Sequence, residues 1–394
     1  MKQRVSAAFA KAFSVVGLLA ATPLSAAFAL PEDKAISLQE AASPIADEVH
    51  AFHNWVMMPI MTGISLFVLG LLLWVVLRYN EKSNPKPDRF SHNTLIEVVW
   101  TAIPIVILLF ISLFSFDLLF KEDRIPDGKQ SVIRVAGSQT DFQLANDFNE
   151  KRKVKRASHL DVRLVRGGEE TKLKRGQDFR ITGLGDEIVT VSLTEPAVDG
   201  DTVIVRGGRT WVGAQKILGM FGEDRSEIAL APTVTLNAIG RQWGWNYEYP
   251  EFGEFEIYAD LLPKEEAGDK WLFATTNDVV VPVGETIRII TNSADVIHSW
   301  AMPAFAFKMD AVPGRNNESW FKSNATGTYY GQCSEICGKD HAFMPISVRV
   351  VTRPEFEAWI DEQRVANGDE PMFGDVTPNV ASAPAFTGAP AGTQ

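Results

Sequence analysis

The chain has 394 residues, 46% of them hydrophobic, and a formal net charge of −11, so it has the length for two or three domains with buried cores. Residues 240–394 contain 22 acidic and 11 basic side chains and therefore carry the whole charge excess. This balance argues against a nucleic-acid-binding protein and favours attraction of a basic partner to the C-terminal third, although a merely solvated acidic surface explains the charge equally well.

Residues 1–29 have the pattern of a cleaved export signal. Three basic residues precede a short apolar run at 13–19, and small residues follow it up to Ala29. The mature chain would then begin near Leu30. An uncleaved membrane anchor is the alternative, but the apolar run is short for a bilayer span.

Two long apolar segments predict a transmembrane helix hairpin. Residues 55–77 carry no ionisable side chain, and as a helix they would measure about 34 Å, enough to cross a bilayer. Residues 96–120 are apolar apart from Glu97 and Asp117 near the two ends. The intervening loop has more basic than acidic residues, so the positive-inside tendency places it in the cytoplasm and both flanking regions outside.

Glu97 lies just inside the second predicted span. A carboxylate is costly there, which makes Glu97 a candidate for a proton path or a partner contact. An ordinary residue reaching toward the membrane surface is the alternative.

The region after the spans is predicted to be all-β, because it alternates short β-branched runs with Gly, Asp and Pro. The predicted strands are 131–135, 160–164, 188–192, 202–205, 233–237, 286–290 and 346–350. Two β modules are expected, one before and one after about Pro232. The basic run at 151–156 is typical of a solvated loop, although it could contact lipid headgroups or an acidic partner.

The two cysteines of the chain, Cys333 and Cys337, lie in a stretch rich in metal ligands. In an exported protein the pair alone favours a disulfide. However, His341 and Met344 follow closely, and His298 lies about one strand pair upstream. Thiolates, imidazoles and a thioether together suit copper, whereas zinc rarely recruits a thioether and the spacing fits neither an iron–sulfur nor a haem motif. The stretch therefore predicts a copper site that relays single electrons.

The run 296–344, with Lys-Met-Asp-Ala-Val-Pro-Gly-Arg at 308–315, resembles subunit II of haem–copper cytochrome c oxidases, the subunit that bears the binuclear CuA centre. The resemblance extends to Gly-Arg-Gln-Trp-Gly-Trp-Asn-Tyr-Glu-Tyr-Pro at 240–250, to Ser-Pro-Ile at 43–45, and to Glu-Val-Val-Trp at 97–100. It implies a two-helix transmembrane hairpin followed by a cupredoxin-like β-sandwich. It also implies the electron-entry subunit of a proton-translocating cytochrome-c oxidase in the bacterial inner membrane, with the N-terminus and the copper domain in the periplasm.

The resemblance further implies roles for individual residues. The copper ligands would be His298, Cys333, the Glu335 backbone carbonyl, Cys337, His341 and Met344. The Glu335 carboxylate would help to hold magnesium at the contact with the catalytic subunit. Trp243, otherwise a packed core aromatic, would admit electrons from cytochrome c, and Glu97 would stand at the entrance of a proton path.

The implied partners are the haem-containing subunit I, subunit III, membrane lipid, and a soluble or membrane-anchored cytochrome c. The docking face for the cytochrome would consist of acidic residues, which otherwise are plain surface charge: Glu248, Asp260, Asp278 and Asp295. Arg241 and Gly244 depart from this family, which more often has His and an aromatic residue at those positions.

The resulting division of the chain has five parts: 1–29 signal peptide, 30–121 N-terminal segment and hairpin, 122–231 inserted β-rich module, 232–367 cupredoxin CuA domain, and 368–394 disordered tail. The inserted module has no counterpart in the usual family pattern, and His159 is its one candidate metal ligand. It would either cover neighbouring parts of the complex or help a cytochrome to dock.

Two other classes of protein remain as alternatives. Subunit II of a quinol oxidase typically lacks the copper ligands, all of which are present here. A membrane-tethered copper-binding or assembly protein would have no use for two spans, Trp243 and an acidic face.

Overall fold

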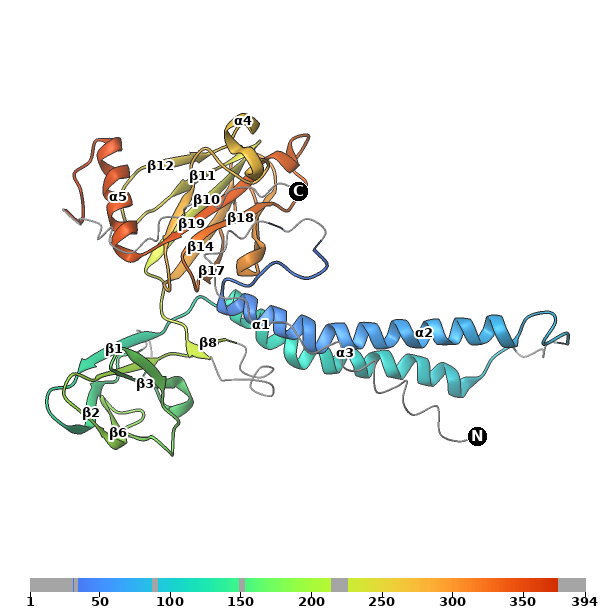
Figure 1. Cartoon of the computed structure of the whole chain (residues 1–394), viewed down its shortest axis with the longest axis horizontal. Helices are drawn as coiled ribbons and strands as arrows, with labels where there is room; N and C mark the ends of the chain where they lie inside the picture. Colours follow the sequence, from blue (N-terminus) through green and yellow to red (C-terminus); the bar gives the residue numbers. More distant parts are fainter. Residues whose placement is uncertain (1–30, 32–34, 87–90, 149–152, 214–225, 375–394) are drawn as a thin grey trace, which may run out of the picture.

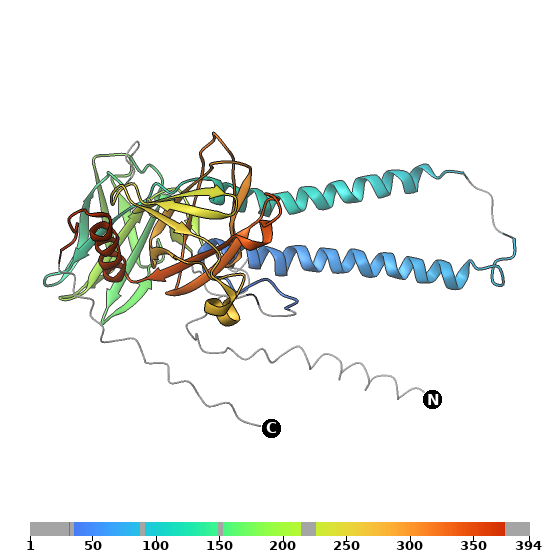
Figure 2. The ribbon, with the colours of Figure 1, turned by 90° about the horizontal axis from the view of Figure 1, so that it is seen from above.

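The computed structural model describes residues 31, 35–86, 91–148, 153–213 and 226–374, so the predicted signal peptide and most of the predicted tail lie outside the described residues. Two long helices project from a pair of β domains, of which the C-terminal domain lies above the inserted module in the view of Figure 1. Figure 2 shows the helices extending to the same side.

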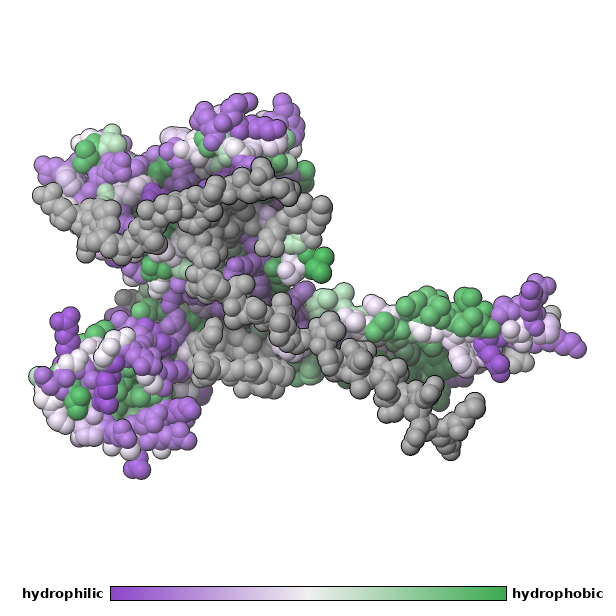
Figure 3. All heavy atoms as spheres, in the orientation of Figure 1, coloured by the Kyte–Doolittle hydropathy of each residue, from purple (hydrophilic) through white to green (hydrophobic). Residues whose placement is uncertain are grey.

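The hairpin is longer than predicted. It consists of two helical rods. The first rod is continuous through α1 (Pro44–Phe52), a π-helical turn (His53–Met57) and α2 (Met58–Arg78). The second rod is α3 (Thr94–Asp123). The Ser43 hydroxyl caps α1 by accepting a hydrogen bond from the Ala46 amide at 2.9 Å, and proline at the first helical position suits this start. Both rods are long and apolar enough to cross a membrane, and their apolar side chains face outward in Figure 3.

The C-terminal domain is a sandwich of two five-stranded sheets around one core. The first sheet has the order β12-β11-β10-β14-β17, and its strands are β10 (Val234–Arg241), β11 (Gly244–Glu248), β12 (Glu256–Ala259), β14 (Thr286–Ser293) and β17 (Asn317–Lys322). The second has the order β13-β19-β18-β15-β16, and its strands are β13 (Val279–Pro282), β15 (His298–Met302), β16 (Phe307–Ala311), β18 (Gly327–Cys333) and β19 (Pro345–Val351). Large aromatic side chains such as Trp245 and Trp300 fill the space between them.

Two helices complete this domain. The short α4 (Lys264–Ala267) lies in the connection after β12. The longer α5 (Arg353–Asn367) begins with a capping box between Thr352 and Glu355, and it buries Phe356 in the sandwich core.

The inserted module has its own core between a four-stranded sheet, β1-β7-β3-β4, and a three-stranded sheet, β2-β6-β5. The strands are β1 (Lys129–Arg134), β2 (Gln139–Ala145), β3 (Leu160–Arg166), β4 (Glu169–Lys172), β5 (Phe179–Thr182), β6 (Ile188–Ala197) and β7 (Thr202–Gly207). Each strand predicted from the alternating runs coincides with a strand of one of the two β domains.

The chain enters and leaves the inserted module through one narrow neck. Gly128 and Leu230 form a parallel bridge there, next to the paired strands β8 (Trp211–Val212) and β9 (Glu227–Ile228). Because the first and last residues of the module lie side by side, it forms a separate unit with its own core.

An ion-pair cluster joins this neck to the sandwich. The Glu227 carboxylate pairs with Lys322 on β17 and with Arg206 and Arg163 of the module. The strand β17 is the edge of its sheet opposite β12, so the module sits on the side of the sandwich away from β12.

The hairpin is tied to the same junction. The Trp320 indole N–H donates to the Lys121 carbonyl at 2.9 Å, and the Lys121 ammonium pairs with Glu48 of α1 at 2.7 Å. The ends of both rods are thereby held against the base of the sandwich.

Candidate metal centre

The predicted metal ligands gather at one end of the second sheet. His298 is the first residue of β15 and Cys333 the last of β18, and these strands pair so that Trp300 lies opposite Cys333. The connection from β18 to β19 carries Cys337 and His341, and Met344 ends it. Strand pairing therefore brings the upstream histidine to a ligand loop that is local in sequence.

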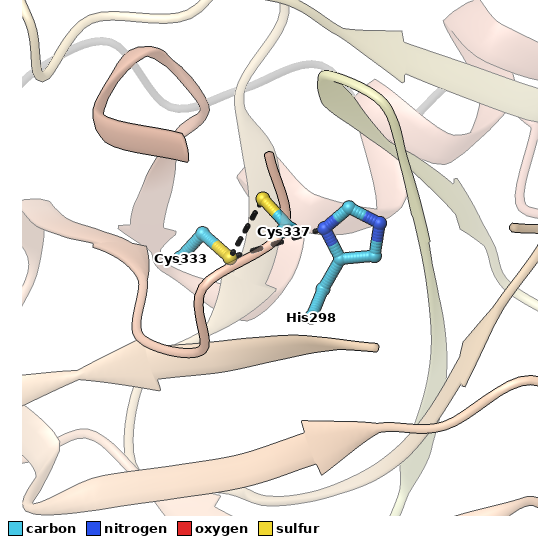
Figure 4. Close-up of side chains that lie close together, drawn as sticks. All are labelled: His298, Cys333 and Cys337. Atoms are coloured by element: carbon cyan, nitrogen blue, oxygen red, sulfur yellow. Dashed lines mark hydrogen bonds between the residues drawn. The ribbon is translucent and has the colours of Figure 1, made fainter. Parts of the chain in front are cut away.

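His298, Cys333 and Cys337 lie side by side (Figure 4), and their ligand atoms are all within 4.8 Å of one another. The Cys333 and Cys337 sulfurs are 3.8 Å apart and form no disulfide. His298 Nδ1 is 3.9 Å from the Cys333 sulfur, and His341 Nδ1 is 3.6 Å from the Cys337 sulfur. Ligands bound to a common metal at about 2.0–2.3 Å in a tetrahedral arrangement are roughly 3.3–3.8 Å apart, so these separations suit a metal centre.

Two weaker donors complete the cluster, one beside each cysteine. The Met344 sulfur lies 3.4 Å from the Cys337 sulfur, and the Glu335 carbonyl oxygen lies 3.3 Å from the Cys333 sulfur. Each thiol therefore has one imidazole and one weaker donor beside it. A set of two thiolates, two imidazoles, a thioether and a carbonyl fits copper better than zinc or a hard cation.

The two thiols differ in acidity. Burial opposes ionisation of Cys333, but hydrogen bonds led by that of His298 lower the pKa of this thiol to about 6. Burial and the neighbouring Cys333 sulfur raise the pKa of Cys337 to about 12. A second thiolate beside the first is thus unfavourable without added positive charge, which a bound metal would supply.

Asp295 and Gly240 position the His298 ring, which is fully buried. The Asp295 carboxylate lies 2.9 Å from His298 Nε2, which leaves Nδ1 facing the thiols. It also accepts a hydrogen bond from the backbone N–H of Gln242 at 2.7 Å. Burial alone would raise the pKa of Asp295, but these hydrogen bonds, led by that of His298, hold it below its usual range. A Cβ atom on Gly240 would stand only 2.8 Å from the imidazole, so the close approach requires glycine.

Trp243 connects this cluster to the protein surface. Its partly buried ring packs against the sandwich core, and its Nε1–H donates to the Cys337 carbonyl at 3.3 Å. The Gln242 side-chain amide donates to the same carbonyl at 2.8 Å. The turn between β10 and β11 is therefore hydrogen-bonded directly to the ligand loop.

The four predicted docking carboxylates are not equivalent. Asp260 forms an ion pair with Arg241, and Asp295 is bound to His298 and Gln242. Glu248 lies at the end of β11 away from Trp243 and accepts a hydrogen bond from Asn237 at 2.9 Å. Asp278 lies just before β13.

Other predicted residues lie away from the cluster. Glu97 is in the first turn of α3, where its carboxylate accepts a hydrogen bond from the backbone N–H of Asn93 at 3.2 Å. His159 lies in a short turn (Ala157–His159) of the inserted module. Sequence reasoning missed the positioning contacts of Gly240, Gln242 and Asp295, although the first two lie in the 240–250 motif and Asp295 is three residues before a predicted ligand.

Two family models match the chain. "Cytochrome C oxidase subunit II, periplasmic domain" matches residues 234–351, and "Cytochrome C oxidase subunit II, transmembrane domain" matches residues 31–118. The strands β1 to β9 fall in the gap between these two matches.

Individual relatives carry similar names. A probable cytochrome c oxidase subunit 2 of Rickettsia felis is 31% identical over 86% of this chain and 75% of its own length. A cytochrome c oxidase subunit 2 of Cereibacter sphaeroides is 29% identical over 90% of each chain. The solved periplasmic domain of subunit II of cytochrome oxidase from Bradyrhizobium japonicum is 47% identical, covers 34% of this chain and 96% of that one, and has a TM-score of 0.33.

The fold and the ligand cluster define a membrane-anchored β-sandwich protein with a cysteine-containing candidate metal centre. The chain belongs to the cytochrome c oxidase subunit II family. It is therefore a two-span membrane subunit of an oxidoreductase, a cytochrome c oxidase, and membership implies CuA copper and a subunit I partner.

Proposed function

We propose that this chain accepts electrons from cytochrome c at a CuA centre and passes them to the haem-containing subunit I, where oxygen reduction is coupled to proton pumping. The strongest support is the cluster of two thiols, two imidazoles, a thioether and a carbonyl, in which neighbouring ligand atoms are 3.3–3.9 Å apart. When bound, the copper pair supplies reversible one-electron redox chemistry.

The chain's own residues fit this role. The buried sandwich and short strand-to-strand connections hold the ligand side chains in place, so their positions need change little between redox states. Trp243 offers a route from the surface to the ligand loop, because its indole N–H contacts the Cys337 carbonyl. We assign Trp243 as the electron entry on this contact.

The family resemblance and the membrane hairpin support further assignments. We infer that residues 30–121 form the membrane part, 122–231 the inserted module and 232–367 the copper domain, with the latter two in the periplasm. The Glu335 carboxylate would bind magnesium at the subunit I contact, and Glu97 would stand at a proton entrance at the loop end of α3. Subunit III and membrane lipid would complete the surroundings.

Metal analysis and EPR of a fragment covering residues 232–374 test the assignment of the centre. The wild-type fragment should bind two coppers per chain that share one unpaired electron. Met344→Leu should alter the spectrum because it removes a ligand, whereas Met309→Leu, at a methionine packed against the same core, should not. One copper or none in the folded wild-type fragment would contradict the assignment.

A further inference from the structure

The surface beside Trp243 contains an ion pair between Arg241, the last residue of β10, and Asp260, which follows β12. An Arg241 terminal nitrogen is 2.6 Å from the Asp260 carboxylate, and its Nε donates to the Asn246 side chain at 2.7 Å. The guanidinium also lies 6.0 Å from the centre of the Tyr258 ring. Three contacts therefore fix this arginine two residues from the proposed electron entry.

Gly244 provides the space for this pair. A Cβ atom at position 244 would stand 2.4 Å from the Asp260 carboxylate, 2.9 Å from an Arg241 nitrogen and 3.0 Å from the Ala259 carbonyl. A side chain at this position would therefore displace the ion pair or the backbone next to it. The two departures from the usual family residues, Arg241 and Gly244, are thus one structural unit.

Two other carboxylates in this region, Asp295 and Asp340, also have partners within the chain. Asp295, on the neighbouring loop, is bound to His298 and to the Gln242 amide. On the ligand loop, the Lys339 ammonium lies 3.9 Å from the Asp340 carboxylate. Asp260, Asp295 and Asp340 thus each have a cationic or hydrogen-bonding partner within the chain.

Exposed apolar side chains adjoin the same place. Val296 and Ile297 are 37% and 45% exposed and follow Asp295 directly. Next to Trp243 the surface therefore combines exposed apolar side chains with carboxylates that already have partners, although the C-terminal third as a whole is acidic.

We propose that the Arg241–Asp260 ion pair determines donor specificity, by neutralising the Asp260 carboxylate next to Trp243 so that the oxidase favours a cytochrome with an apolar, weakly basic contact face over a strongly lysine-rich one. This inference rests on the proposed electron entry at Trp243. The acidic C-terminal domain would still attract a basic cytochrome from a distance. Once the cytochrome is in contact, however, a dense ring of lysines on its surface would add little to the binding free energy.

Steady-state oxidation by the purified oxidase tests the proposal with two donors, a lysine-rich cytochrome c and a cytochrome c of near-neutral contact face. Arg241→Gln leaves Asp260 unpaired and should raise kcat/KM for the lysine-rich donor about two- to fourfold at low ionic strength, with a steeper salt dependence. Asp260→Asn leaves Arg241 unpaired and should lower it by a similar factor. The near-neutral donor should respond to neither change.

Arg288→Gln is the matched control, because Arg288 forms an exposed ion pair with Glu318 at the other edge of the same sheet and its loss changes the net charge equally. If Arg241→Gln and Arg288→Gln behave alike, or if the two variants at the ion pair slow both donors equally, the specificity role is refuted. If Trp243→Phe oxidises both donors at the wild-type rate, the proposed electron entry fails instead.

Discussion

Gly240→Ala tests whether the packing around His298 controls the metal centre. The added Cβ would lie 2.8, 2.9 and 3.0 Å from three carbon atoms of the His298 side chain. Ordinary carbon–carbon contacts are about 3.5–4.0 Å, so the side chain must move by roughly 0.5–1 Å. The fully buried ring has little free space, since Trp245 meets it edge-on at 6.0 Å between ring centres.

The expected result has two parts. Overpacking of this kind costs about 1–3 kcal/mol of unfolding free energy, measured by denaturant titration of the metal-free fragment 232–374. The ring shift exceeds the tolerance of about 0.5 Å for a preorganised site, so copper affinity should fall and the EPR spectrum should change.

Ala304→Val is a suitable control, because Ala304 is fully buried just beyond Met302, which ends β15 at the end opposite His298. This change should lower stability without altering the copper spectrum. A Gly240→Ala protein with wild-type copper affinity and spectrum would refute the reasoning, whatever its stability.

Two further predictions concern other contacts. Glu227→Gln should lower the unfolding free energy by about 2 kcal/mol at neutral pH, less than for a fully buried pair because the side chain is 16% exposed. Burial would raise the pKa of Glu227, but Lys322 and two arginines hold it below its usual range, so this stabilisation is present above the unfolded pKa and disappears as pH falls through the folded pKa. Denaturant titrations from pH 7 to 3 should therefore converge for the two proteins, and a constant difference would contradict the assignment. Asp295→Asn should weaken the orientation of His298 and lower copper affinity about 10- to 100-fold, measured by competition with a copper chelator, whereas unchanged affinity would exclude a positioning role.

Much of the architecture follows from local sequence patterns. The absence of charge in 55–77 and the alternation of β-branched residues predicted the spans and the strands, because burial requires those patterns whatever the neighbours. The first helix of the hairpin nevertheless begins at Pro44, earlier than predicted. Its first part, α1, is amphipathic and packs against the β domains, so the search for an uninterrupted apolar segment did not include it.

The candidate site, too, could be predicted from the sequence in part only. The two cysteines with His341, Met344 and the upstream His298 were enough to predict copper, since one short loop carries most of the donors. The charge asymmetry and the resemblance predicted an acidic docking face. They could not show that Asp260 is paired with Arg241 and that Asp295 is bound to His298.

Residue types and their near spacing were thus enough to predict the membrane hairpin, the β character of both domains and the candidate metal ligands. The folded structure was needed to show which strands bring His298 to the cysteines, where the inserted module attaches, and which carboxylates are already paired. Those features depend on contacts between residues far apart in the chain, and the pairing of β15 with β18 or of Arg241 with Asp260 leaves no periodic pattern in the sequence.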